Sequence, residues 1–121
     1  MILGVGTDVV EVVRIKRAFE RTGNRFLQKV FTEAELEYCW SRPNPWPHLA
    51  TRFAAKEAVI KALGFGVDPR EVEVYREDDG SPAVALHGSA SEAAARYGTV
   101  DFKISLSHTA NIAIACALAL C

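Results

Sequence analysis

The longest helix signal in the chain is the segment Arg52-Phe53-Ala54-Ala55-Lys56-Glu57-Ala58-Val59-Ile60-Lys61-Ala62-Leu63. Alanine and leucine favour helix, and no glycine or proline interrupts the segment. Gly64 follows directly, and glycine is a common residue just after a helix end. Because three prolines stand among residues 43–47, we expect this central helix to begin at about His48 and to run to Leu63.

Charged side chains on this helix suggest a ligand. Arg52 and Lys56 lie four residues apart, as do Glu57 and Lys61, so each pair occupies one helical face. One carboxylate among three cations suits a phosphate-rich ligand whose charge is shared between basic groups and a divalent metal. The alternative is structural, because Glu57 ahead of Lys61 is also the favoured order for a surface ion pair worth about 0.3–0.5 kcal/mol. The segment alone leaves both interpretations open.

The composition predicts one globular domain spanning residues 1–121. Hydrophobic residues make up 50% and charged residues 24% of the chain, which is ordinary for a globular protein. The net charge of −1 argues against a nucleic-acid partner. Three cysteines without zinc-like spacing, and no secretory leader, predict reduced thiols and a cytoplasmic protein. The apolar run at residues 112–120 is far shorter than the ~20 residues that span a bilayer, so we expect no membrane association.

The N-terminal segment predicts a strand followed by a helix. Residues 2–10 are rich in valine and isoleucine and should form a strand that ends near Asp8. Gly4 and Gly6 inside this strand indicate a bulge or a close backbone approach. A helical period in the apolar residues begins at about Glu11.

The basic side chains of that first helix form a stripe. Arg14, Arg17 and Arg21 follow the spacing i, i+3, i+7, and residues 11–30 carry six basic against two acidic residues. A solvated charged face is the default interpretation, but three arginines in line without interleaved acids are less usual on a helix. An acidic helix of a partner protein is therefore the competing hypothesis.

The rest of the chain predicts antiparallel strands. Thr32 and Glu35 fit a capping box, which gives Glu35 a structural role unless its carboxylate faces a cleft. Asp78-Asp79-Gly80 marks a hairpin turn, and apolar and polar residues alternate from 100 to 107. Residues 112–120 are apolar on both faces, so a helix or another subunit should cover the second face. We therefore predict an α+β fold in which a mainly antiparallel sheet wraps around the long central helix.

Two carboxylates predict a metal site. Asp8 and Glu57 supply hard oxygen ligands, and two carboxylates with phosphate oxygens and water are what Mg²⁺ usually accepts. The strand ends at Asp8 and Ser107 would place His108 beside Glu57. The basic groups available to a pyrophosphate at this site are Arg52, Lys56, Lys61 and His108.

Four blocks of the sequence, in order, resemble a known family. These blocks are Gly4–Ile15, Phe31–Glu35 with Tyr38-Cys39, Arg52–Ala58 and Ile104–Thr109. Together they resemble the holo-[acyl-carrier-protein] synthases, which are small bacterial 4′-phosphopantetheinyl transferases. The resemblance covers essentially the whole chain, and the block Arg52–Ala58 is its most specific part.

The resemblance implies a reaction and a set of roles. The 4′-phosphopantetheine arm of coenzyme A moves to a serine hydroxyl of an acyl carrier protein, and adenosine 3′,5′-bisphosphate leaves. Asp8 and Glu57 would hold Mg²⁺ on the pyrophosphate, and Lys61 would ease departure of the leaving group. The stripe of Arg14, Arg17 and Arg21 would meet an acidic helix of the carrier protein. The implied coenzyme A contacts are Arg52, Lys56, Lys61, Ser107, His108 and Thr109, with Arg52 and His108 at the adenosine end and its 3′-phosphate.

The chain departs from the family pattern at two positions. Thr109 stands where some members carry an aspartate after the histidine, so the general base stays open among Glu35, His108 and a metal-bound water. Ser81 stands where many members carry lysine, so a ligand contact there is not carried over. The family is typically a homotrimer with sites between subunits, which agrees with the need to cover residues 112–120.

Two rival functions use the same residues. A metal-dependent phosphohydrolase would release phosphopantetheine without a carrier protein, and a non-catalytic trimeric module would bind coenzyme A without Mg²⁺ tightening the binding. The arginine stripe favours the transferase, because a hydrolase needs no protein acceptor. The sequence does not decide the preferred carrier protein, the selectivity for free against acylated coenzyme A, or the role of the three cysteines.

Overall fold

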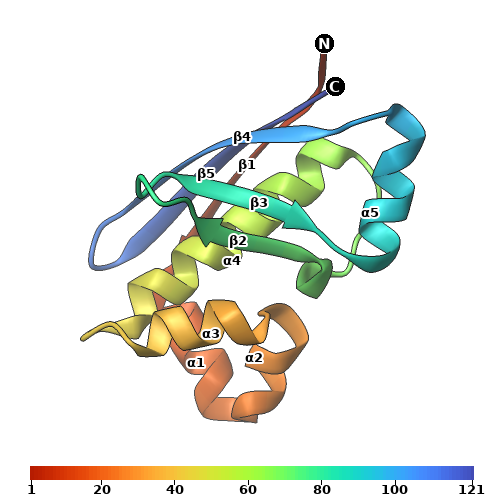
Figure 1. Ribbon diagram of the computed structural model, residues 1–121. Coiled ribbons are helices and arrows are strands. Elements are labelled where there is room, and N and C mark those ends of the chain that lie inside the picture. Colours follow the sequence, from red (N-terminus) through yellow and green to blue (C-terminus); the bar gives the residue numbers. More distant parts are fainter.

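The computed structural model describes residues 1–121 and contains five α-helices and five β-strands (Figure 1). The strands and helices follow in the order β1 Ile2–Glu11, α1 Val12–Thr22, α2 Asn24–Val30, α3 Glu33–Trp40, α4 Pro45–Leu63, β2 Val72–Arg76, β3 Pro82–Leu86, α5 Gly88–Ala94, β4 Asp101–His108 and β5 Ile112–Leu120. Short 3₁₀ turns at Pro69–Glu71 and Ala95–Tyr97 complete the chain.

The strands form two antiparallel sheets around the central helix α4. One sheet has the order β1-β5-β4 and the other is the β2–β3 hairpin. Helix α4 lies between the two sheets, with α1, α2 and α3 together at one end of the molecule and α5 at the other (Figure 1). The predicted α+β fold with a long central helix is confirmed, as is the hairpin turn at Asp78-Asp79-Gly80.

Small residues let α4 lie unusually close to the three-stranded sheet. A Cβ atom on Gly4 or Gly6 would collide with the backbone carbonyls of Ala62 and Ala58 on α4. On β5, the side chains that face α4 are four fully buried alanines: Ala113, Ala115, Ala117 and Ala119. The close backbone approach predicted from Gly4 and Gly6 is therefore confirmed, and the irregular register between Ile2 and Gly4 supplies the predicted bulge.

Two predicted boundaries were wrong. Strand β1 continues to Glu11, so Asp8 lies within the strand opposite Ala115 and does not end it. Helix α4 begins at Pro45, three residues before the predicted start at His48. Proline is tolerated there because the N–H groups of a first helical turn have no intrahelical partner.

The outer face of the three-stranded sheet is apolar and uncovered. Val5 and Val9 on β1 lie next to Leu118 and Ile114 on β5, and Val9 and Ile114 are 62% and 50% exposed. This is the second face of residues 112–120 that the sequence expects another element to cover. The termini lie side by side, since the N-terminal ammonium of Met1 donates to the carbonyl oxygen of Cys121 at 2.8 Å. No helix has the length and apolar character needed to cross a bilayer.

Candidate active site

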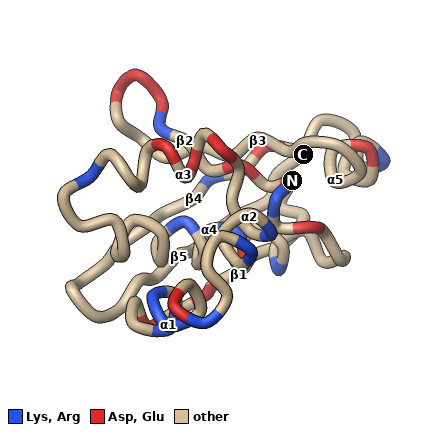
Figure 2. The backbone as a smooth tube through the Cα atoms, turned by 90° about the horizontal axis from the view of Figure 1, so that it is seen from below, with Lys and Arg blue, Asp and Glu red and all other residues tan.

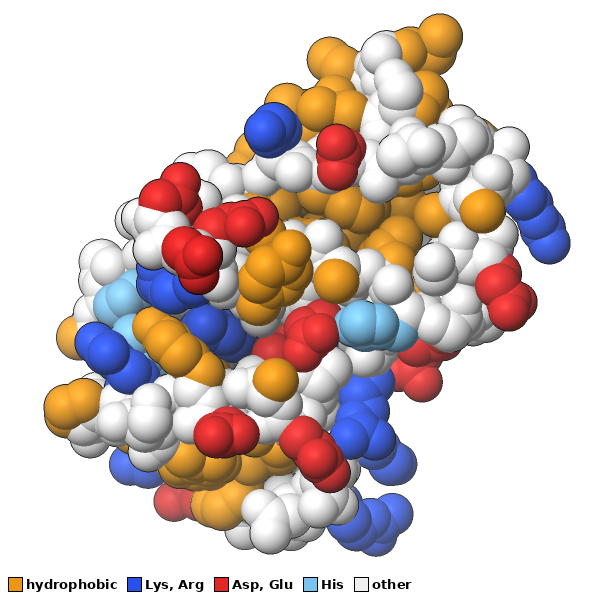
Figure 3. Space-filling model, viewed as in Figure 1, with side chains coloured by type: hydrophobic (Ala, Val, Ile, Leu, Met, Phe, Trp, Pro, Cys, Tyr) orange, Lys and Arg blue, Asp and Glu red, His pale blue; other side chains and the backbone are white.

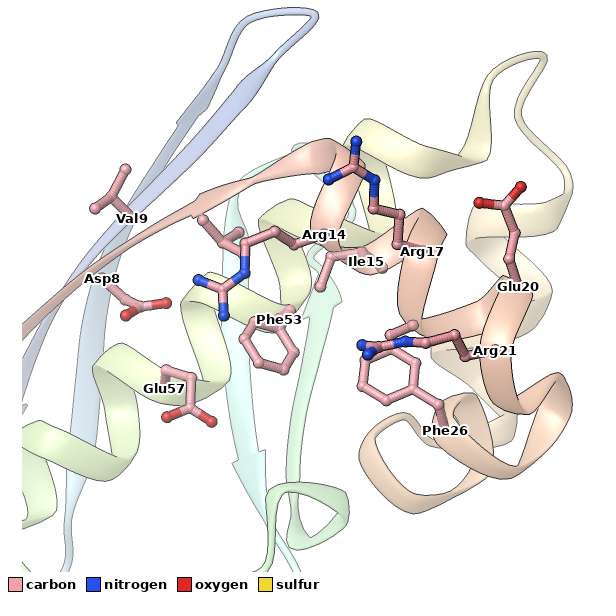
Figure 4. A pocket seen from close by; sticks show the side chains of 12 residues that line it. Asp8, Val9, Arg14, Ile15, Arg17, Glu20, Arg21, Phe26, Phe53 and Glu57 are labelled. Carbon is pink, nitrogen blue, oxygen red and sulfur yellow. The ribbon is translucent and has the colours of Figure 1, made fainter.

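Asp8 and Glu57 line one cavity of about 740 Å³ between β1, α1 and α4. Asp8 comes from the middle of β1, and Glu57 comes from the turn of α4 that packs against this strand. Figure 4 shows the two carboxylates facing one another, with Phe53 and the guanidinium of Arg14 beside them. The fold therefore brings together the two predicted metal ligands, which are far apart in the sequence.

Glu57 is poised to bind a cation. Burial raises the pKa of the Glu57 carboxyl, the negative charge of Asp8 raises it further, and Lys61 opposes both effects. Lys61 Nζ donates to the backbone oxygen of Thr7 at 2.9 Å and lies 3.4 Å from Asp8 Oδ1. One exposed lysine does not neutralise two adjacent carboxylates, so a divalent cation suits the site.

The donor set is compatible with a hard divalent cation such as Mg²⁺. The chain holds no cluster of three or more His, Cys, Asp or Glu side chains that could enclose a metal. Two carboxylates on an open cavity are instead the protein share of a site where Mg²⁺ keeps water and takes phosphate oxygens from the substrate. Asp8 and Glu57 therefore fit a metal that arrives with, or is completed by, a phosphate-bearing ligand.

The arginine stripe of α1 lies on the same cavity. Arg14, Arg17 and Arg21 all line it, and none of them is paired with a carboxylate. Their side chains point from α1 toward the cavity and its rim in Figure 4, and Figure 2 shows the basic segments of α1 on the outside of the molecule. A basic, solvent-facing rim next to two carboxylates is suited to an acidic macromolecule that brings a reacting group to this cavity.

Arg52 and His108 lie on a different cavity. This second cavity, of about 250 Å³, opens between α4, β2 and β4 and is also lined by His48 and Arg76. Arg52 and Glu57 are five residues apart on α4 and so face different directions. The prediction that His108 would lie beside Glu57 was wrong within one chain, because β5 separates β4 from β1 in the sheet.

The second cavity is strongly cationic. In Figure 3 basic and histidine side chains gather on one side of the molecule, between the β2–β3 hairpin and the start of α4. Arg52 is only 4% exposed, and its Nε–H has no hydrogen-bond partner. A buried guanidinium with an unused donor at a cavity wall can bind an anionic group. His48 and Arg76 were not singled out from the sequence, since nothing in their local pattern shows that they meet across the fold.

Lys56 and Glu35 form a buried ion pair. Lys56 Nζ lies 2.7 Å from Glu35 Oε1 and also donates to the backbone oxygens of Pro69 and Val72 at 2.9 and 2.6 Å. Glu35 accepts two further hydrogen bonds, from the backbone N–H of Thr32 in the predicted capping box and from that of Val74. Neither side chain has a free polar group for a ligand. Both side chains thus have a structural role, and the candidate roles of Lys56 in coenzyme binding and of Glu35 as a base stay predictions that these contacts disfavour.

The remaining candidates lie at the end of β4. Ser107 is exposed on the outer face of the sheet, opposite Ile114. Thr109 accepts hydrogen bonds from the backbone N–H groups of Asn111 and Ile112, both at 3.1 Å, and so closes the β4–β5 turn. Neither residue lines either of the two cavities within one chain.

The sequence and the fold match one class of enzyme. The family model for the 4′-phosphopantetheinyl transferase superfamily matches residues 4–117. The holo-[acyl-carrier-protein] synthase of Thermodesulfovibrio yellowstonii is 49% identical over 117 residues, which cover 95% of this chain and 96% of that protein. The chain belongs to this superfamily and, within it, to the holo-[acyl-carrier-protein] synthases.

Solved structures agree with this assignment. The holo-[acyl-carrier-protein] synthase of Neisseria meningitidis superposes with a TM-score of 0.92 at 30% identity, with full coverage of both chains. The enzyme of Bacillus anthracis, solved in complex with CoA (3′,5′-ADP), superposes with a TM-score of 0.79 at 28% identity over 98% of this chain and 96% of that one. The predicted family resemblance is therefore confirmed.

Proposed function

We propose that the chain transfers the 4′-phosphopantetheine arm of coenzyme A to a serine hydroxyl of an apo acyl carrier protein. The serine oxygen forms a new bond to the phosphorus that carries the pantetheine, the pyrophosphate P–O bond breaks, and adenosine 3′,5′-bisphosphate leaves. The observation that carries this proposal is the meeting of Asp8 and Glu57 in one cavity with an unpaired arginine stripe on its rim. Family membership supplies the substrate class.

Asp8 and Glu57 would hold Mg²⁺ at this cavity. The metal would neutralise charge on the pyrophosphate, which is the main requirement of phosphoryl transfer. Lys61 is more than half exposed, and its ammonium contacts only the backbone oxygen of Thr7 and, at 3.4 Å, Asp8, so it keeps a donor for a leaving phosphate. The serine proton would pass to His108 or a metal-bound water, since the oxygens of Glu35 are buried and already accept hydrogen bonds.

Arg14, Arg17 and Arg21 would receive the carrier protein. Their exposed guanidiniums stand in line along α1, within the same cavity as the carboxylates. Docking an acidic helix there would bring its serine toward Asp8 and Glu57. Charge complementarity of this kind speeds encounter as well as adding affinity.

Coenzyme A would bind across a subunit boundary of a homotrimer. In one chain the carboxylates and the cationic cavity lie on the same, α4-facing side of the three-stranded sheet, but at its opposite edges, β1 and β4. The uncovered apolar face of β1 and β5 gives the contact surface, and closed rotational symmetry would cover it in every subunit. The Arg52 cavity of one subunit would then complete the Asp8 cavity of its neighbour. A cytoplasmic location agrees with three unpaired cysteines.

The test is a transfer assay followed by mass spectrometry of the intact carrier protein. The protein is incubated with coenzyme A, Mg²⁺ and an apo carrier, and the carrier should gain the mass of one phosphopantetheine group. Chelation of the metal should abolish the gain, and Glu57→Gln serves as the matched inactive variant. An unchanged carrier would contradict the proposal. Release of free phosphopantetheine with no carrier present would instead identify a phosphohydrolase.

A further inference from the structure

Tyr38 stands at the centre of a cluster of cations beside the second cavity. The guanidinium carbon of Arg52 lies 4.2 Å from the centre of the Tyr38 ring, and those of Arg42 and Arg76 each lie 5.8 Å from it. Arg76 Nε also donates a hydrogen bond to Tyr38 Oη at 3.1 Å, and His48 meets the ring edge-on at 6.0 Å. One aromatic ring thus contacts three arginines that come from three different segments of the chain.

No acidic group in the structure balances this cluster. None of Arg42, Arg52 and Arg76 forms an ion pair with a carboxylate. The thiol of Cys39, which is near Arg52, gives no negative charge because burial raises its pKa to about 11. Burial lowers the pKa of His48, and the neighbouring arginines and His108 lower it further. The like charges repel one another, so something in the fold has to hold them together before an anion arrives.

The ring of Tyr38 meets this need. Its face attracts cations without neutralising them, so the guanidiniums keep their charge and their free N–H groups for a ligand. Helix α3, which carries the ring, begins with the Thr32 capping box and is tied to α4 by the buried ion pair of Glu35 and Lys56. The unused Nε–H of Arg52 shows that donors remain available.

We propose that Tyr38 is a positioning residue that gathers Arg42, Arg52 and Arg76 into a preformed site for a phosphomonoester dianion. The inference rests on the proposed function, which makes this dianion the 3′-phosphate of coenzyme A. Arg52 and Arg76 line the small cavity, and Arg42 lies beside them at the Tyr38 ring. Several guanidiniums match the three terminal oxygens and double charge of a phosphomonoester better than the single charge on each phosphate of a diester linkage. Tyr38 therefore determines how strongly the enzyme distinguishes coenzyme A from 3′-dephospho-coenzyme A without touching either substrate.

The experiment compares kcat/KM for coenzyme A and for 3′-dephospho-coenzyme A. The wild-type protein should prefer coenzyme A by at least about tenfold, since charge-assisted hydrogen bonds to the 3′-phosphate are lost in the analogue. Tyr38→Leu should reduce this preference by about tenfold or more through the KM for coenzyme A, with kcat nearly unchanged. Tyr38→Phe keeps the ring and loses only the contact to Arg76, so it should keep most of the preference.

A matched control is Tyr97→Leu. Tyr97 stacks on Phe65 and lines neither of the two cavities described here, so its loss should leave the preference unchanged. A merely structural role for Tyr38 would lower kcat/KM for both substrates by the same factor and leave their ratio intact. If Tyr38→Leu does not fold, Arg76→Ala tests the same cluster, because it removes one guanidinium from the exposed side of the Tyr38 ring. This variant should lower the preference for coenzyme A over 3′-dephospho-coenzyme A and leave kcat nearly unchanged.

The outcomes separate this inference from the function beneath it. A wild-type protein that transfers phosphopantetheine but treats both substrates alike would overturn the 3′-phosphate site and the role of Tyr38 together. A wild-type protein that discriminates, with Tyr38→Leu discriminating equally well, would overturn the role of Tyr38 and leave the proposed function standing. A selective loss of preference in Tyr38→Leu and Arg76→Ala, with Tyr97→Leu unaffected, is the expected result.

Discussion

Helix α4 carries two lysines that each meet an acidic residue, in opposite environments. Lys56 and Glu35 are 2.7 Å apart and have essentially no exposed side-chain surface. Lys61 and Asp8 are 3.4 Å apart, with the two side chains 55% and 19% exposed. The sequence places the two lysines five residues apart in one helical segment, and nothing in their residue types separates their roles.

The difference lies in how completely each charge is satisfied. Lys56 has three oxygen partners and Glu35 has three donors, so the buried pair holds α3, α4 and β2 together. Neither side chain has a free donor or carboxylate oxygen left for a ligand. Lys61 and the carboxylates of Asp8 and Glu57 remain underpaired at a cavity. Lys56 therefore uses its charge for the fold, whereas Lys61 and Glu57 keep their charges for a ligand.

Lys56→Met should give the largest effect, on stability. It leaves the Glu35 carboxylate buried without its cation, which typically costs about 3–5 kcal/mol. Denaturant unfolding should show this loss, while Lys61→Met, the matched exposed variant, should change stability by less than about 1 kcal/mol. Equal losses in the two variants would contradict the division of α4 into a structural and a functional part.

Glu57→Gln should remove transfer and slightly stabilise the fold. We expect kcat to fall by at least about a hundredfold, because one of two metal ligands is lost. The raised pKa of Glu57 means that the ionised carboxylate destabilises the folded protein at neutral pH. Without metal, Glu57→Gln should therefore melt about 1–3 °C higher than the wild-type protein. This gain should disappear below about pH 4, where the carboxyl is protonated in both folded and unfolded protein. Near-normal turnover of Glu57→Gln in Mg²⁺ would contradict the assignment of Glu57 as a metal ligand.

Lys61→Ala should lower turnover with little structural cost. Removing a mobile cation near the leaving phosphate should reduce kcat by about tenfold, while the exposed contact to Asp8 contributes under about 1 kcal/mol to stability. Steady-state kinetics and thermal melting on the same preparation measure both quantities. A variant that loses stability and keeps its kcat would show that Lys61 resembles Lys56 after all.

Arg14→Ala should give a smaller change, confined to the carrier protein. The KM for the carrier should rise by about three- to tenfold, and the KM for coenzyme A should stay within about twofold. The wild-type KM for the carrier should also rise with salt, since the stripe is exposed and its charges are screened. A KM that does not respond to salt would argue against docking on α1.

Local patterns predicted much of the fold. Helical and alternating periodicity predicted the central helix, the strand at β4, the hairpin and the Thr32 capping box, because each depends on residues close together in the chain. The paired glycines of β1 predicted a close approach without naming the partner, which is α4. The starts and ends of elements were less accurate, since prolines at Pro45 and Pro47 are compatible with the first turn of a helix as well as with a loop.

The site was harder to predict, because its residues meet only in the folded chain. Residue type identified Asp8 and Glu57 as a pair, and the structure places them together. Residue type could not show that Lys56 is buried against Glu35, or that Arg52 and His108 face a second cavity. The three arginines around Tyr38 come from separate segments, so no spacing in the sequence predicts that they meet.

The most direct test of the shared site is complementation between two inactive variants. Asp8→Asn disables the carboxylate cavity, and His108→Glu places a negative charge in the cationic cavity at an exposed position. Each variant alone should be inactive at limiting coenzyme A. Co-expressed at equal levels, they should recover about one quarter of the wild-type rate, because random mixing joins an intact Asp8 cavity to an intact cationic cavity at about one interface in four. Mixed oligomers, verified by native mass spectrometry, that show no activity above the two variants alone would contradict a site built from neighbouring subunits.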